Sequence, residues 1–80
     1  MDDVELVQRI TTLADEEHKL ERRHAGDPLS QEDLDRLRSL EVALDQCWDL
    51  LRQRRARRHS GLDPDGASVR SEGTVEGYVQ

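Results

Sequence analysis

Two heptad patterns, separated by one glycine–proline corner, constrain the fold of this 80-residue chain more than any other feature. The first pattern places Leu6, Ile10, Leu13 and Leu20 at steps of 4, 3 and 7. The second pattern has steps of 3, 4, 3 and 4 and consists of Leu37, Leu40, Leu44, Cys47 and Leu51. Apolar residues at these steps lie on one face of an α-helix. Each pattern therefore predicts an amphipathic helix with one apolar stripe.

The end signals of the first pattern predict a helix over about residues 3–24. Asp2 or Asp3 is suited to cap the amino end, where a carboxylate also complements the helix dipole. The corner Gly26-Asp27-Pro28 ends the pattern, because proline disfavours helical geometry at the residue before it.

The second helix is predicted over about residues 31–58. Ser30 and Asp33 have the spacing of a capping box, in which the two side chains bind amide groups that the helix start leaves unpaired. Ser60 and Gly61 follow the pattern, and glycine commonly ends a helix.

The short corner predicts how the two helices pack, because a connection of this length makes neighbouring helices antiparallel. The sequence therefore predicts an all-α fold: an antiparallel two-helix coiled-coil hairpin over residues 1–59. Residues 60–80 mix Gly, Asp, Ser and Pro with isolated valines. That composition is typical of a flexible or loosely docked tail, which we expect to be mostly irregular.

The apolar surface of the second helix is broader near residues 43–51 than one partner helix covers. Four residues form this apolar stripe: Leu44, Cys47, Trp48 and Leu51. A chain of this size buries little core, and tryptophan is enriched in protein interfaces. We therefore expect a homodimer, which would be a four-helix bundle, or docking on an unidentified protein partner.

The net charge of −6 conceals a local basic run, the arginine segment. It consists of Arg52, Arg54, Arg55, Arg57 and Arg58, with no acid among them. One interpretation is a solubilising helix end that complements the dipole and pairs with the acidic amino terminus, with Arg52 and Arg55 beside Asp2, Asp3 and Glu5. The alternative is an accessory factor that contacts RNA or another polyanion, because guanidinium groups bind phosphate well.

A metal-binding bundle is the third hypothesis, since Glu21 and His24 have the Glu-x-x-His spacing of carboxylate-bridged metal sites. Asp15 and His18 repeat that spacing, but most of these residues lie off the apolar stripe and would not point inward. Cys47 has no Cys or His at metal-ligand spacing. The sequence therefore predicts no catalytic site, no cofactor and no metal.

Cysteine usage and hydropathy indicate the compartment. Cys47 is the single cysteine, the start of the chain is acidic, and no apolar run approaches the 18 residues of a membrane span. We expect a cytoplasmic protein. The residues indicate no membrane partner, and no small-molecule substrate is inferred from them.

The run from Leu44 to Arg58, LDQCWDLLRQRRARR, resembles the signature of a short actinobacterial family, the domain of unknown function 2630. The segments 15–18, 63–70 and 75–78 are similar to that family as well. The resemblance implies a small stand-alone cytoplasmic protein in which the tail belongs to the unit, and it implies no activity. Taken with the residues, it predicts a non-catalytic protein-interaction module.

Overall fold

The computed structural model describes residues 1–23 and 26–79 of the chain. Its elements are two long helices, α1 (Asp3–Arg23) and α2 (Gln31–His59), a short 3-10 helix, η1 (Pro64–Gly66), and a final helix, α3 (Glu72–Val79). The described residues contain no strand. The all-α prediction is confirmed; residue 24, where the first helix was predicted to end, lies outside the described residues.

Both long helices begin at the caps that the sequence predicts. The Asp2 carboxylate accepts a hydrogen bond from the Glu5 amide (2.8 Å), and the Ser30 hydroxyl accepts one from the Asp33 amide (3.1 Å). Each bond satisfies an amide that has no partner within its helix. Gly61, which follows α2, has a φ of 77°, a conformation that glycine adopts without steric cost.

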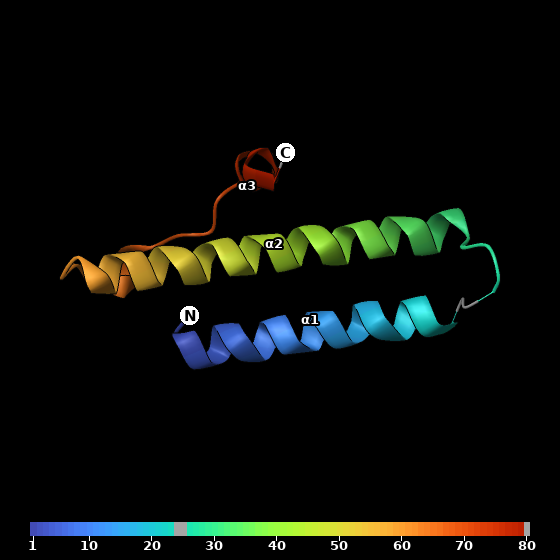
Figure 1. The fold of residues 1–80 in the computed structure, drawn as a ribbon, viewed down its shortest axis with the longest axis horizontal. Coiled ribbons are helices and arrows are strands. Elements are labelled where there is room, and N and C mark those ends of the chain that lie inside the picture. Colours follow the sequence, from blue (N-terminus) through green and yellow to red (C-terminus); the bar gives the residue numbers. More distant parts are fainter. Residues whose placement is uncertain (24–25, 80) are drawn as a thin grey trace.

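α1 and α2 lie side by side and antiparallel (Figure 1). Ion pairs fix their register: Asp3 Oδ1 lies 2.6 Å from Arg54 Nε, and Glu16 Oε2 lies 2.6 Å from Arg36 Nη2. As residue numbers rise along α1, those of their partners fall along α2. With 29 residues against 21, α2 is the longer helix by roughly 12 Å at 1.5 Å per residue.

The core is an aliphatic seam between α1 and α2. Its buried residues are Leu6, Ile10, Leu13, Leu20, Leu40, Cys47, Leu50 and Leu51. Seven of these eight belong to the predicted heptad stripes, and Leu50 flanks the second stripe. The antiparallel coiled-coil hairpin is therefore confirmed.

The tail returns along α2, and in Figure 1 α3 lies on the side of α2 opposite α1. Gln53 Nε2 donates to the Ser68 carbonyl oxygen (2.8 Å), and Gln46 Nε2 donates to the Arg70 carbonyl oxygen (3.2 Å). Val75 is 1% exposed. The tail thus combines irregular segments with two short helices, and it buries an apolar side chain that the sequence analysis treated as isolated.

The molecule is elongated, with principal extents of 50 × 25 × 15 Å and a radius of gyration of 14.9 Å. A compact domain of 80 residues has a radius of gyration of about 12 Å. The accessible surface is 5698 Å², whereas a compact monomer of this mass exposes about 4,900 Å². The hairpin therefore leaves roughly 800 Å² more surface in solvent than a compact fold does.

Candidate interaction surfaces

Arg54 is a structural member of the arginine segment. Its side chain is only 8% exposed and lies between two carboxylates, with Nε 2.6 Å from Asp3 Oδ1 and Nη1 3.0 Å from Asp65 Oδ1. These pairs connect the start of α1 with α2 and η1. Because the guanidinium is buried and paired, it is not available to an outside anion.

Arg57 and Arg58 are also engaged within the chain. Arg58 Nη2 lies 2.7 Å from Asp3 Oδ2, so this carboxylate receives two guanidinium groups. The hydrogen bonds from Arg54 and Arg58 lower the pKa of Asp3. Arg57 Nε donates to the Asp63 carbonyl oxygen (2.6 Å).

Arg52 and Arg55 are exposed, and within the described part of the chain neither makes an ion pair or hydrogen bond. The charge pattern predicts that Arg52 and Arg55 pair with the acidic amino terminus, but in the structure Asp3 pairs with Arg54 and Arg58. The heptad steps explain the difference, because steps of 3 and 4 from Leu51 lead to Arg54 and Arg58. Extending the heptad spacing of the second helix beyond Leu51 would therefore have identified Arg54 and Arg58 as the arginines that face α1.

The four residues of the predicted apolar stripe divide into two pairs. Cys47 (8% exposed) and Leu51 (1% exposed) are buried in the seam. Leu44 is half-buried, and Trp48 is 43% exposed. Only Leu44 and Trp48 are therefore open to a partner.

Val7 of α1 lies level with Trp48 of α2. Asp3 of α1 pairs with Arg54 of α2, and Glu16 of α1 pairs with Arg36 of α2. Because residue numbers fall along α2 as they rise along α1, linear interpolation between these two pairs places Val7 beside residues 47–49. Helical periodicity puts Val7 and Trp48 on the same side of the hairpin, away from the Glu16–Arg36 pair. Val7 is itself 47% exposed. We call the surface formed by Val7, Leu44 and Trp48 the Trp48 face.

The Trp48 face has a charge of opposite sign at each end. Glu41 precedes Trp48 by seven residues and Arg55 follows it by seven. Both side chains are exposed. At the acidic end, burial and the neighbouring carboxylates of Glu21 and Glu41 raise the pKa of Glu17.

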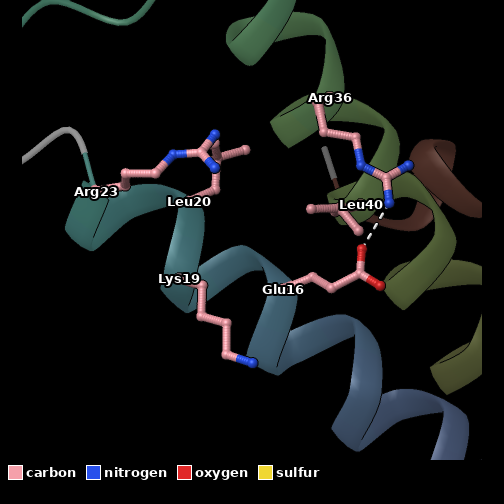
Figure 2. Close-up of a pocket in the computed structure, with 6 residues that line it drawn as sticks. All are labelled: Glu16, Lys19, Leu20, Arg23, Arg36 and Leu40. Carbon is pink, nitrogen blue, oxygen red and sulfur yellow. Dashed lines mark hydrogen bonds and ion pairs between the residues drawn. The ribbon is translucent and has the colours of Figure 1, made fainter.

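The other side of the hairpin carries an open pocket of about 430 Å³ (Figure 2). Leu20 and Leu40 form its apolar part, and the Glu16–Arg36 ion pair bridges α1 and α2 across it. Both members of this pair are more than 40% exposed. Exposed pairs of this kind stabilise a fold weakly.

Residues 1–23 and 26–79 contain no group of three or more His, Cys, Asp or Glu side chains placed to hold a metal ion. His24 of the Glu-x-x-His pattern lies outside the described residues. No helix over the same residues has the length and hydropathy needed to cross a bilayer.

Comparison with known proteins agrees with the resemblance seen in the sequence. The family model described as "Protein of unknown function (DUF2630)" matches residues 2–80. Uncharacterized proteins of Mycobacterium tuberculosis and Mycobacterium bovis are each 50% identical over 79 residues, which cover 96% of this chain and 90% of the relative. No solved structure matches the chain significantly.

Proposed function

Because the chain belongs to the DUF2630 family of proteins of unknown function, we propose its role from its own surface: it is a non-catalytic interaction module that associates with a second copy of itself. The Trp48 face is the contact surface. The dimer would join two hairpins into a four-helix assembly in which each α2 contacts its counterpart.

The exposure of Trp48 beside Val7 is the observation that carries this proposal. Trp48 is 43% exposed and Val7 47% exposed, at the same level of the hairpin. The chain has one tryptophan and one tyrosine, so its largest apolar side chain is left half in water. Tryptophans in such positions are the residues most enriched at the energetic centres of interfaces.

The size of the surface supports the same conclusion. The hairpin exposes roughly 800 Å² more than a compact monomer of its mass. A standard protein interface buries about 800 Å² on each partner. A dimer through one side of the hairpin would therefore bring the exposed area per chain to that of a compact fold.

Sedimentation equilibrium at micromolar concentrations tests the proposal. The wild-type chain is expected to be a reversible dimer, and Trp48→Ser to be a folded monomer. Leu62→Ser removes another exposed apolar side chain (54% exposed) outside the Trp48 face, and it is the matched control that keeps the dimer. A wild-type chain that stays monomeric over this concentration range overturns the proposal.

Contact with RNA or another polyanion is the second candidate function. The observation that favours it is that Arg52 and Arg55 of the arginine segment are exposed and have no partner among the described residues. Arg52 and Arg55 are four and seven residues after Trp48, so all three share one side of α2. The double variant Arg52→Gln/Arg55→Gln should then weaken binding of a fluorescent RNA oligonucleotide. The slope of the logarithm of the binding constant against the logarithm of the salt concentration should also become less steep, by an amount that corresponds to about two phosphate contacts. Equal binding by wild type and variant rejects this candidate.

A further inference from the structure

Trp48 lies at the midpoint between two opposite, unpaired charges. Glu41, Trp48 and Arg55 are spaced by seven residues, which keeps them on one line along α2 at about 10 Å intervals. Neither Glu41 nor Arg55 has a hydrogen bond or ion pair among the described residues. The Trp48 face thus has an apolar centre, an acidic end and a basic end.

This arrangement is complementary to itself under a two-fold rotation. In an interface with two-fold symmetry, the same patch on both copies makes every contact twice. Rotation about an axis through Trp48, perpendicular to α2, exchanges the acidic and basic ends. From this symmetry, and resting on the proposed function, we infer that two copies pair antiparallel through α2, with Trp48 at the axis and Glu41 of each copy against Arg55 of the other.

The opposite orientation is disfavoured by the same charges. A parallel pair through this face would set Glu41 against Glu41 and Arg55 against Arg55. Like charges in contact across an interface cost free energy and select against the wrong partner orientation. The charges on each side of Trp48 therefore specify the direction of the second copy.

Residues closer to the axis fit the antiparallel arrangement as well. Leu44 and Arg52 lie four residues before and after Trp48, so the rotation sets half-buried Leu44 beside Arg52 of the other copy. The aliphatic stem of an arginine covers apolar surface while its guanidinium stays in water. Arg55 of the other copy would also approach Glu17, whose acidic neighbours lie on the same side.

Charge reversal, with the dimer dissociation constant measured by sedimentation equilibrium at low salt, tests the orientation. Glu41→Arg alone and Arg55→Glu alone each put like charges in contact twice, so each should raise the dissociation constant at least about tenfold. The double variant Glu41→Arg/Arg55→Glu restores opposite charges and should return the constant to near the wild-type value. Asp15→Arg is the control. It reverses an exposed charge on the side of α1 that faces away from α2, and it should leave the dissociation constant unchanged.

The outcomes separate this inference from the function on which it rests. If the wild type dimerises and Trp48→Ser does not, but the single reversals have no effect, the copies meet in another orientation and the inference fails alone. A double variant as weak as the single variants rejects the Glu41–Arg55 contact in the same way. If the wild type is a monomer, the proposed function fails and this inference fails with it. Helical content by circular dichroism confirms that each variant is folded.

Discussion

Asp3 and Arg54, 51 residues apart in the sequence, form the contact that closes the open end of the hairpin, with Oδ1 and Nε 2.6 Å apart. The same guanidinium binds Asp65, which belongs to η1. One buried cation therefore fixes the amino terminus, the end of α2 and the beginning of the tail. This geometry gives the arginine segment a structural role before any role in binding.

Replacing Asp3 should destabilise the fold. Asp3→Asn leaves the buried Arg54 guanidinium with Asp65 as its remaining charged partner, and burying a charge with fewer partners is unfavourable. The thermal midpoint of unfolding should fall by several degrees. Glu5→Gln, a change of an exposed acid in the same first turn, is the control and should have little effect. Equal midpoints for both variants would contradict the structural role of the Asp3–Arg54 pair.

The same contact predicts how stability depends on pH. Hydrogen bonds from Arg54, and then from Arg58, lower the pKa of Asp3 below its ordinary value of 3.8. A lowered pKa means that the pair contributes its stability above the ordinary value, and that this contribution is lost as pH falls through the lowered pKa. Thermal melts from pH 6 to pH 2 should therefore show a steeper acid loss for wild type than for Asp3→Asn. Parallel curves would show that Asp3 titrates alike in the folded and unfolded chain.

The attachment of α3 should have the opposite dependence on pH. Burial, and a hydrogen bond between the side chains of Glu76 and Asp45, raise the pKa of Glu76. A raised carboxyl pKa means that the contact is strongest at low pH and weakens as pH rises from the ordinary value through the raised one.

Glu76→Gln should therefore strengthen the docking of α3 at neutral pH, because the amide donates to Asp45 without needing a proton. The Val75 amide, which donates to the Ser71 carbonyl oxygen, reports this docking by hydrogen exchange. Its protection factor, which is the exchange rate of an unfolded amide at the same pH divided by the observed rate, should rise severalfold at pH 7 in the variant and lose most of its dependence on pH between 4 and 7. Faster exchange in the variant would contradict the assignment.

The stability of the hairpin core should be sensitive to substitution of Leu51, although the sequence predicts that this residue contacts a partner together with Leu44, Cys47 and Trp48. Leu51 is 1% exposed, so Leu51→Ala removes buried methyl groups and leaves a cavity, at a cost of about 2–5 kcal/mol. Leu62→Ala, at a side chain 54% exposed, should change stability by less than about 0.5 kcal/mol. Chemical denaturation measures both. Similar small losses for the two variants would mean that the seam does not extend to Leu51.

The hairpin could be predicted because its signals are local. The step between Leu13 and Leu20, the Ser30 cap and the Gly26 corner each depend on residues near them in the sequence. Helix type, helix ends and the antiparallel packing follow from such patterns. The family resemblance also came from a contiguous run, residues 44–58.

The tail and the arginine contacts depend on residues far apart, and local patterns do not encode them. Val75 reads as an isolated valine in a glycine-containing stretch, yet it is buried because α3 returns along α2. Asp49 reads as a surface acid, yet it is 4% exposed and binds Gln53 Nε2 at 2.9 Å. Arg54 was grouped with its neighbours by charge, although its heptad position turns it toward α1. Extending the heptad spacing past Leu51 would have distinguished Arg54, which faces α1, from Arg52 and Arg55, which face solvent.

The fluorescence of Trp48, the one tryptophan of the chain, is the most direct measurement of the central claim. If two copies meet at this residue, raising the protein concentration should move its emission maximum to shorter wavelength. That change should follow the fraction of dimer measured by sedimentation, and in Glu41→Arg it should occur at protein concentrations at least about tenfold higher. An emission maximum that stays constant while the mass doubles would show that the copies meet elsewhere, and a constant maximum with constant mass would show that the chain does not self-associate.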